Sequence, residues 1–588
     1  MASTSLTFTA LADSPIGLRI KKHWHVVVLT LVFLGVSLTG LASLPVIDRD
    51  EARFAQASVQ MAESGDLLNI RFQDRARNKK PAGIYWLQTA SLKVFSTPTE
   101  RTLWAQRLPS VLGALLAVLA TYWGGAKLVG RKAAFIGALA MALSLLLIFE
   151  SHIAKTDAVL CGLGAVCFAS IAVIRSRPST GLSLWRAAPD IRTVIWAFWL
   201  ALGFSVLIKG PVIPSLIALT LVTLLIWEKR GHGIRQLINI PAMFVSALIF
   251  IPWAIAIGLE TQGAFFAESL GKDFGGKLVS AQESHPGPFG YHFGAIWLTL
   301  WPGSLLLTPG FYFAFHILKK NKTSPSPIAK SIRLCLAWII PYWLLIEIMP
   351  TKLPHYALPL FPALCLLIGL AAVGILKGTE RKISRFIGGL AFILSAFAII
   401  IGLLTGKILY GGEEAIIPVF TLALVAGLLA FISGFAFWFN KIKPAFITAA
   451  ICAVTLNIMA YGFVLPTLSD LRLADRIETA FAEEGIALPR KSGPKVHALN
   501  FTEPSLVYRL GKDMRLGDQT DLSEPSLWVE GSVFIIDALE NEGATLASFE
   551  TAAQKNQTCY SNFNTIEGLN YSRGDDVELR LLRLKSCD

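Results

Sequence analysis

The sequence predicts an all-α polytopic membrane protein that ends in a small α/β domain, and composition carries most of this prediction. Of the 588 residues, 54% are hydrophobic and only 16% are charged, whereas a soluble chain carries roughly 25% charged residues. Apolar runs of about 20 residues, long enough to cross a bilayer, recur through the first 465 residues. Beyond residue 465 the composition becomes more polar, which indicates a separate domain outside the membrane.

The apolar runs predict about 13 membrane-spanning helices. Their expected ranges are 25–45, 103–124, 132–149, 157–174, 192–208, 211–227, 239–258, 293–316, 332–349, 356–376, 384–404, 415–438 and 444–465. The fifth and sixth form the closest pair, because only Lys209, Gly210 and Pro211 mark the boundary between them. We therefore expect residues 1–465 to form the membrane domain and residues 466–588 to form the closing α/β domain.

Basic residues gather at the N-terminus and in every second loop. Segments 175–192, 319–333 and 377–385 are examples rich in Lys and Arg. Cytoplasmic loops of membrane proteins show this excess, so the chain is expected to begin in the cytoplasm and to end on the outer side of the bilayer. Because topology explains the net charge of +13, nucleic-acid binding is excluded as its cause.

The outer side carries two long loops, at 46–102 and 259–292, and the C-terminal domain. The first loop has an amphipathic pattern, with Phe54, Val59 and Met61 against Glu63 and Asp66, and such segments commonly lie along the membrane surface. The C-terminal domain is predicted to contain a helix at 467–487 and strands at 496–501, 533–537 and 577–584. Its two cysteines, Cys559 and Cys587, are candidates for a disulfide if the compartment is oxidising.

Carboxylates at the outer ends of the spans are candidates for chemistry. Three carboxylates and two guanidinium groups occur within the six residues from Asp48 to Arg53, although a solvated turn at the interface would also explain them. Asp157 opens the fourth span. A carboxylate facing lipid is costly, so Asp157 is expected to face a cavity or a partner.

Three outer lysines run against the positive-inside bias. Lys80, Lys209 and Lys352 each lie beside Pro or Gly, or within two residues of Pro. Snorkelling to the interface is one explanation. A function is the other, because several cations beside a few carboxylates at a membrane surface suit a lipid-linked phosphate.

Three strings resemble the bacterial aminoarabinose transferase family. They are Asp50-Glu51-Ala52-Arg53-Phe54-Ala55, Asn78-Lys79-Lys80-Pro81-Ala82-Gly83-Ile84-Tyr85-Trp86-Leu87 and Thr351-Lys352-Leu353-Pro354-His355-Tyr356-Ala357-Leu358-Pro359. That family is similar to the protein O-mannosyltransferases, within the polyprenyl-phosphate-sugar-dependent GT-C glycosyltransferases. The resemblance covers most of the membrane part, and the Lys-Leu-Pro-His-Tyr string is its most specific element.

The resemblance implies a GT-C fold and an inverting glycosyltransferase of the bacterial inner membrane. Its donor would be a sugar on polyprenyl phosphate, and its acceptor a periplasmic glycolipid such as lipid A. Matched by position, Asp50 and Asp157 are the expected catalytic residues. Those expected to bind the donor phosphate or substrate are Glu51, Arg53, Lys80, Lys209, Lys352, His355 and Tyr356. Glu268 and His285 are further candidates for metal or substrate binding, although a polar turn explains them as well.

One position departs from the family pattern. Family members typically carry an acidic residue, associated with a bound metal, immediately before the loop lysine, and this chain has Lys79 there. A lysine removes a metal ligand and adds a repelling charge, so the divalent metal is not carried over and no cofactor is expected. The extra cation leaves the sugar open, because it could favour an acidic sugar or another phosphate.

The reaction so implied displaces a phosphate leaving group from an anomeric carbon. Outer cations such as Lys80 and Lys209 would stabilise the leaving charge. Asp50 would be a general base for a hydroxyl acceptor, or would orient a phosphate acceptor or support the oxocarbenium charge. The alternative is a transporter or flippase of polyprenyl-linked sugars, which should place its sites in broken helices near the midplane. The ionisable residues instead cluster at outer ends of spans, which favours an enzyme.

Overall fold

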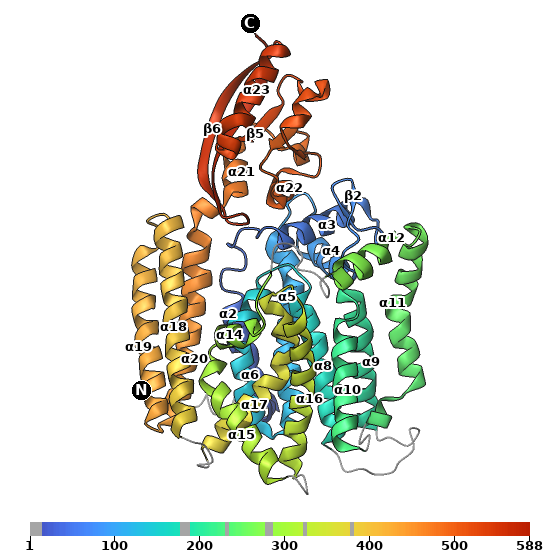
Figure 1. Cartoon of the computed structure of the whole chain (residues 1–588), viewed down its shortest axis with the longest axis vertical. Coiled ribbons are helices and arrows are strands. Elements are labelled where there is room, and N and C mark those ends of the chain that lie inside the picture. Colours follow the sequence, from blue (N-terminus) through green and yellow to red (C-terminus); the bar gives the residue numbers. More distant parts are fainter. Residues whose placement is uncertain are drawn as a thin grey trace.

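The computed structural model describes residues 15–176, 189–229, 234–276, 286–321, 326–376 and 382–587. A bundle of apolar helices carries a small sheet domain at one end (Figure 1). Between them lie α3 (Asp50–Ser64) and α4 (Gly83–Phe95), the helices of the first long loop. We call the end of the bundle that carries the sheet domain the domain side.

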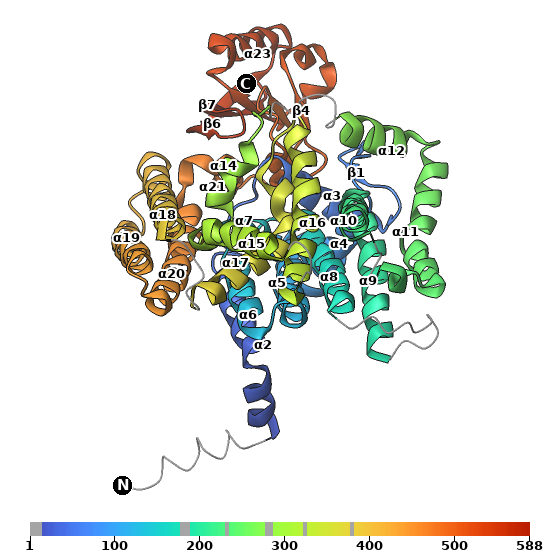
Figure 2. The ribbon, with the colours of Figure 1, turned by 60° about the horizontal axis from the view of Figure 1, so that its bottom comes forward.

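In the described residues, nine helical stretches are long and apolar enough to cross a membrane. They comprise α5 (Leu103–Leu128), α8 (Asp157–Arg175), α9 (Pro189–Lys209), α11 (Ile240–Glu260), α16 (Pro327–Ile348), η5 with α17 (Pro354–Leu360 and Phe361–Ile375), α18 (Lys382–Tyr410), α19 (Ile416–Trp438), and α20 with the π-helical η6 (Ile442–Asn457 and Ile458–Val464). Figures 1 and 2 show α18, α19 and α20 on one side of the bundle and α9, α10 (Val212–Glu228) and α11 on the other. The polytopic all-α prediction is confirmed.

The count of spans differs from the predicted 13. A bent pair, α6 (Arg131–Ala142) and α7 (Leu145–Ser151), turns by 57° and would make a tenth span. The remaining three predicted spans are α10 and the apolar part of α2 (Pro15–Ser37), which are short, and one that is broken. The broken one consists of α14 (Tyr291–Thr299), η4 (Gly303–Leu306) and α15 (Leu307–Lys320).

The two breaks contact each other. Leu145, the first residue of α7, donates its backbone N–H to the carbonyl oxygen of Trp301 at 3.0 Å. Pro302 follows Trp301 and has no N–H to continue a helix. Backbone groups freed by a break in a membrane need a partner inside the protein, and these two segments supply one to each other.

The first predicted span, 25–45, ends earlier than expected. Helix α2 stops at Ser37, and turns follow it. Gly40 adopts a φ of +74°, and a Cβ there would lie 1.9 Å from the carbonyl oxygen of Tyr461. Only glycine fits at this close approach. The turn at Gly40 directs the chain from the bundle toward α3.

The C-terminal domain is a mixed five-stranded sheet with helices on both faces. Its strands are β3 (Val496–Leu499), β4 (Arg515–Gly517), β5 (Val533–Asp537), β6 (Cys559–Asn570) and β7 (Asp575–Lys585), in the order β4-β3-β5-β7-β6. Strand β3 is parallel to β4 and β5, and β7 is antiparallel to β5 and β6. The three predicted strands are present, whereas β4 and β6 were not predicted.

Residues on β5 alternate between the two faces of this sheet. Val533 and Ile535 pack with α21 (Leu473–Glu483) and α22 (Pro504–Leu510), while Phe534 and Ile536 pack with α23 (Ala544–Lys555). Cys559 and Cys587 form a disulfide that joins the outer ends of β6 and β7. Short elements complete the chain: β1 (Arg71–Phe72), β2 (Arg75–Ala76), η2 (Ile234–Leu237), α12 (Ala264–Phe266), η3 (Ala267–Gly275), η7 (Leu465–Thr467), η8 (Ser469–Leu471), η9 (Pro489–Lys491), η10 (Gln519–Ser523), η11 (Pro525–Leu527) and η12 (Glu540–Gly543).

Helix α3 is buried on two faces, which differs from the expected surface helix. Ala55 and Val59 pack against Tyr508 of α22. Phe54 and Met61 join the core of the membrane domain. The sheet domain covers the face that the sequence pattern leaves for solvent, so the helix that begins at Asp50 is held from both sides.

Candidate active site

A cavity of about 560 Å³ opens on the domain side, where the first loop meets the bundle. This volume is typical of small-molecule sites. Its charged lining residues are Asp50, Arg77, Lys79, Lys80, Lys155, Asp157, Lys209 and His355. Its apolar wall includes Phe250, Trp253, Phe265, Phe266, Leu345, Ile346 and Met349. Among the predicted residues, the cavity therefore brings together Asp50, Lys80, Asp157, Lys209, His355 and Tyr356.

The start of α8 and the end of α9 meet in an ion pair at this cavity. Lys209 Nζ lies 2.6 Å from Asp157 Oδ1, and the two side chains are 15% and 6% exposed. Thr156 donates its hydroxyl to the other oxygen, Oδ2, at 3.2 Å. Asp157, the carboxylate that begins α8, therefore has a charged partner and lines a cavity, as its position in the sequence suggested.

Lys155 and Glu150 extend this cluster. Lys155 Nζ lies 3.1 Å from Glu150 Oε1 and 3.7 Å from Asp157 Oδ2. The His355 ring nitrogens lie 3.8 Å from Glu150 and 3.9 Å from Asp157. Burial alone would lower the pKa of Lys155, but the carboxylates of Glu150, Asp157 and Asp50 outweigh burial and raise it. Lys155 is therefore a cation at the polar end of the cavity.

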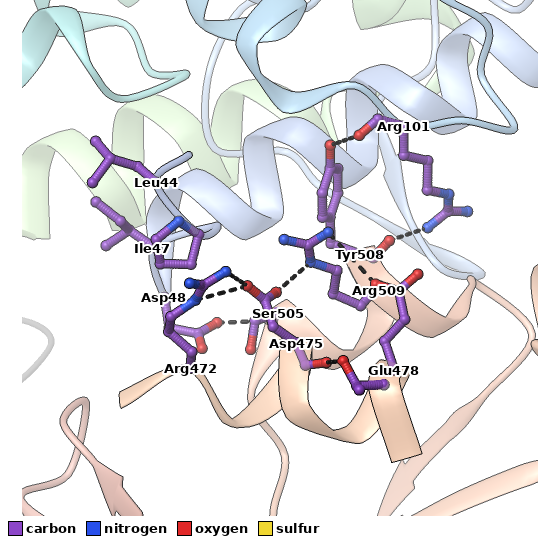
Figure 3. A network of polar contacts seen from close by, with 12 residues as sticks. Leu44, Ile47, Asp48, Arg101, Arg472, Asp475, Glu478, Ser505, Tyr508 and Arg509 are labelled. Carbon is purple, nitrogen blue, oxygen red and sulfur yellow. Dashed lines mark hydrogen bonds and ion pairs between the residues drawn. The ribbon is translucent and has the colours of Figure 1, made fainter. Parts of the chain in front are cut away.

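The C-terminal domain holds the residues just before Asp50. Asp48 Oδ1 accepts the backbone N–H of Ser505 at 2.8 Å (Figure 3). The Asp48 backbone N–H donates to the Tyr571 hydroxyl at 2.6 Å. Arg49 Nε lies 3.2 Å from the buried carboxylate of Glu503. These contacts fix the start of α3, and with it the position of Asp50.

A second set of contacts joins Tyr508 of α22 to Arg101, which precedes α5 (Figure 3). The buried Tyr508 hydroxyl donates to the carbonyl oxygen of Arg101 at 2.6 Å and lies 2.8 Å from Gln106 Oε1. Arg101 Nη1 returns hydrogen bonds to Gln56 Oε1 of α3 at 2.9 Å and to the carbonyl oxygens of Val507 and Tyr508. The sheet domain, the first loop and α5 are therefore one connected unit around the cavity.

Asp48 is a titratable group at the interface with the sheet domain. Burial raises its pKa to about 7, and the charge of Glu503 adds to the rise. The hydrogen bond from Ser505 and the charge of Arg53 oppose it. Docking of the sheet domain therefore favours the protonated form of Asp48.

Glu51, which was expected to bind substrate, is buried and does not line the cavity. Its carboxylate accepts hydrogen bonds from Arg107 Nε and Nη2, both at 2.8 Å, and both side chains are 0% exposed. The backbone N–H groups of Ala154 and Ile47 also donate to it, at 2.7 and 2.9 Å. All its acceptor directions are in use, so Glu51 is a positioning residue that ties the first loop to the segment carrying Lys155.

Lys352, which was expected to bind substrate, does not line the cavity. Its Nζ donates to the carbonyl oxygens of Ile346 and Glu347 at 3.0 and 2.5 Å, and lies 3.7 Å from Glu347 Oε2. These carbonyls belong to the last turn of α16, where a cation satisfies free acceptors and the helix dipole. The Glu347 carboxylate is itself held by the backbone N–H groups of Gly290 and His292.

Two other predicted residues, Arg53 and Glu268, are described by the structure and do not line the cavity. Arg53 follows Asp50 on α3, and its charge acts on Asp48. Glu268 lies on η3, whose neighbouring residues Ser269 and Leu270 do line the cavity. His285 lies outside the described residues.

Sequence reasoning missed several residues of the site. Arg107 is a lone arginine inside an apolar span, and the cost of such a charge could have revealed a buried partner. Glu150 and Lys155 were seen only as part of a mixed-charge loop. Arg77 gave no signal, because nothing in its local pattern distinguishes it from the exposed Arg75.

Among the described residues, the cavity lining shows no set of side chains arranged to hold a divalent cation. Lys79 lines the cavity at the position where similar proteins are expected to have an acidic residue. Asp157 is already paired with Lys209. Throughout the described residues, no three His, Cys, Asp or Glu side chains are grouped as metal ligands.

Comparison with known proteins gives the class of this chain. Residues 27–263 match the family model described as dolichyl-phosphate-mannose-protein mannosyltransferase. The undecaprenyl phosphate-alpha-4-amino-4-deoxy-L-arabinose arabinosyl transferase of Aeromonas hydrophila is 27% identical over 485 residues, which cover 79% of this chain and 81% of that protein. The chain is a membrane glycosyltransferase similar to the aminoarabinose transferases. The protein of the same name from Yersinia pestis is 24% identical over 76% of this chain and 78% of its own length.

Solved structures show the same fold for this glycosyltransferase. The crystal structure of ArnT from Cupriavidus metallidurans bound to undecaprenyl phosphate superimposes with a TM-score of 0.69 at 18% identity, covering 94% of this chain and 97% of that one. An Archaeoglobus fulgidus oligosaccharyltransferase is more distant, with a TM-score of 0.52, 13% identity, and coverage of 92% and 69%. The transporter alternative is set aside, because the similar proteins are transferases.

Proposed function

We propose that this glycosyltransferase moves a sugar, with inversion, from a polyprenyl phosphate donor to lipid A or another envelope glycolipid. The observation that carries the proposal is the two-part lining of the cavity. Lysines and carboxylates form one part, and aromatic and aliphatic side chains of α11, α12 and α16 form the other. A polyprenyl phosphate sugar has the same division, with an anionic head and an apolar chain. The similar Aeromonas hydrophila protein is named for an undecaprenyl phosphate donor.

Lys80 and Lys209 are placed to receive the donor phosphate. Both line the cavity, and Lys209 is fixed by its 2.6 Å contact with Asp157. A preorganised cation stabilises the charge that develops on the leaving phosphate, without reorganisation during the reaction. In this assignment Asp157 positions Lys209, while Lys80 reaches the phosphate from the first loop.

Asp50 is the carboxylate assigned to the reacting centre. Unlike Asp157, its side chain makes no hydrogen bond or ion pair with any described residue. It can take the proton of an attacking hydroxyl as a general base. With a phosphate acceptor, which is already anionic, the same carboxylate orients the acceptor or supports the oxocarbenium charge.

We place the cavity on the periplasmic side of the bacterial inner membrane, with a cytoplasmic N-terminus and a periplasmic C-terminus. The Lys and Arg residues of alternate loops support this orientation. The disulfide between Cys559 and Cys587 of the C-terminal domain also supports it, because disulfides persist in oxidising compartments such as the periplasm.

A transfer assay with purified protein tests the proposal. The full chain is incubated with polyprenyl phosphate sugars and lipid A or other envelope glycolipids, and the product is detected by mass spectrometry. Asp50→Asn should lower kcat by about 100-fold or more, the range for loss of a general base. Asp74→Asn, an exposed carboxylate of the same loop, is the control and should leave kcat unchanged. Unaltered transfer by Asp50→Asn would refute the role of Asp50, and no transfer by wild type with any donor would refute the function.

A further inference from the structure

The first-loop wall of the cavity carries two cations besides Lys80. Arg77 and Lys79 lie in the segment between β2 and α4, and both line the cavity. A polyprenyl phosphate sugar is a phosphodiester with a single negative charge. Lys80 and Lys209 are already assigned to that charge, so this wall of the cavity carries more positive charge than the donor phosphate needs.

Arg77 is held in a defined orientation. Its Nε donates to the Tyr85 hydroxyl at 3.2 Å. Its guanidinium carbon lies 5.1 Å from the ring centroid of Phe54, a cation–π contact. The Phe54 and Tyr85 rings are stacked with centroids 5.3 Å apart, and both are buried. The ring pair thus fixes the guanidinium one helical turn along α3 from Asp50.

Among the described residues, the two Nη atoms of this guanidinium have no protein partner. In the described part of the chain, neither Nη atom of Arg77 donates a hydrogen bond, and no carboxylate forms an ion pair with it. A planar fork fixed at Nε presents parallel N–H groups that match a carboxylate or phosphate in a bidentate manner. The arrangement is that of an anion-binding arginine in a cavity.

We propose that Arg77, with Lys79 beside it, forms a second anion subsite for the substrates of this cavity. The group that it binds is a carboxylate on the transferred sugar or a phosphate on the acceptor glycolipid. The inference rests on the proposed function, because it names the substrate class of the same site. A positively charged amino sugar is disfavoured here, since two cations would face it.

Kinetics with matched substrates test this subsite and identify the source of the anion. The donors are polyprenyl phosphates that carry a uronic acid or the corresponding neutral hexose. The acceptors are a phosphorylated glycolipid and its dephosphorylated form. Arg77→Gln should lower kcat/KM by about 10- to 100-fold for the substrate that carries the second anion, the loss expected for charge-assisted hydrogen bonds. The substrate that lacks the anion should change by about 3-fold or less.

Two variants make the result specific. Arg77→Lys keeps the charge but loses the fork, so its kcat/KM should lie between those of wild type and Arg77→Gln. Arg75→Gln, an exposed arginine of the same hairpin that does not line the cavity, should behave as wild type. Loss only with the uronic acid donor assigns the subsite to the sugar, and loss only with the phosphorylated acceptor assigns it to the acceptor. Equal loss with all substrates, or no loss with any, would overturn the proposal.

Binding gives a readout that does not depend on turnover. The affinity of each substrate is measured by quenching of tryptophan fluorescence, since Trp253 lines the cavity. Wild type should bind the anionic member of one pair about 10-fold or more tightly than its neutral counterpart, and Arg77→Gln should lose this difference. If wild type transfers no sugar, the proposed function fails, and this comparison still decides the subsite: equal affinities within both pairs would refute it.

Discussion

The buried Glu51–Arg107 pair predicts the outcome of one substitution, Arg107→Met. The Glu51 carboxylate accepts two hydrogen bonds from Arg107 and two from backbone N–H groups, all between 2.7 and 2.9 Å. Methionine replaces much of the arginine stem but not its charge. The substitution therefore leaves a carboxylate without its cation at a position with no access to water.

The magnitude follows from what is left unpaired. Breaking a buried ion pair by removing one partner costs about 3–5 kcal/mol. Arg107 also donates to the carbonyl oxygens of Leu41, Leu44 and Pro45 at 3.0, 3.0 and 2.6 Å. These acceptors would lose a donor as well, so we expect Arg107→Met to lower the free energy of unfolding by about 5 kcal/mol. Glu51→Gln keeps an acceptor oxygen for the arginine and should cost about 3 kcal/mol.

Thermal unfolding of the purified full chain in detergent measures this order. The midpoint should fall most for Arg107→Met and less for Glu51→Gln. The double variant should lose less than the sum, because it buries no uncompensated charge. Arg515→Gln is the control, since its pairs with Asp521 and Glu524 are partly open to solvent and such pairs contribute little to stability. The reasoning is refuted if Arg107→Met unfolds at the same midpoint as this control.

Two further predictions concern residues outside the cavity. Docking raises the pKa of Asp48 from 3.8 to about 7, so the folded form binds this proton more tightly than the unfolded form. The stability contributed by that proton is fully present below pH 3.8 and is lost as pH rises to about 7. Asp48→Asn should flatten this part of the profile of unfolding midpoint against pH, and an unchanged slope would contradict the assignment. Lys352→Met should lower the unfolding midpoint, because the end of α16 loses its cation, while the KM for the donor stays within about 3-fold of wild type. A raised KM at an unchanged unfolding midpoint would contradict this and would indicate that Lys352 binds the donor.

Much of the fold could be predicted because runs of apolar residues indicate membrane-spanning helices. The sheet domain was also foreseeable, since 533–537 is a short buried strand and proves to be β5. The breaks near Ser144 and Pro302 were not. An apolar run does not show that Leu145 finds the Trp301 carbonyl more than 150 residues away. The burial of α3 likewise depends on a domain that follows it by some 400 residues.

A site residue could be predicted where its charge stands out against an apolar span, because a buried charge needs a partner. Asp157 at the head of a span needs a partner, and Lys209 is that partner. Lys352 was misplaced because capping of the last turn of α16 is visible only when the chain is folded. Arg77 was missed because its position at the cavity wall depends on contacts with Tyr85 and Phe54, which form only in the folded chain. Local sequence contains none of these contacts.

The central claim is that the cavity under α3 holds a lipid-linked phosphate. Photo-crosslinking with a polyprenyl phosphate that carries a photoreactive group in its first isoprene units tests it most directly. Peptide mapping should place the label on the apolar wall, in α11, α12 or α16, with Phe250, Trp253 and Met349 among the labelled residues. Excess unlabelled polyprenyl phosphate should remove the label. Labelling confined to α18, α19 and α20 on the opposite side of the bundle would contradict the claim.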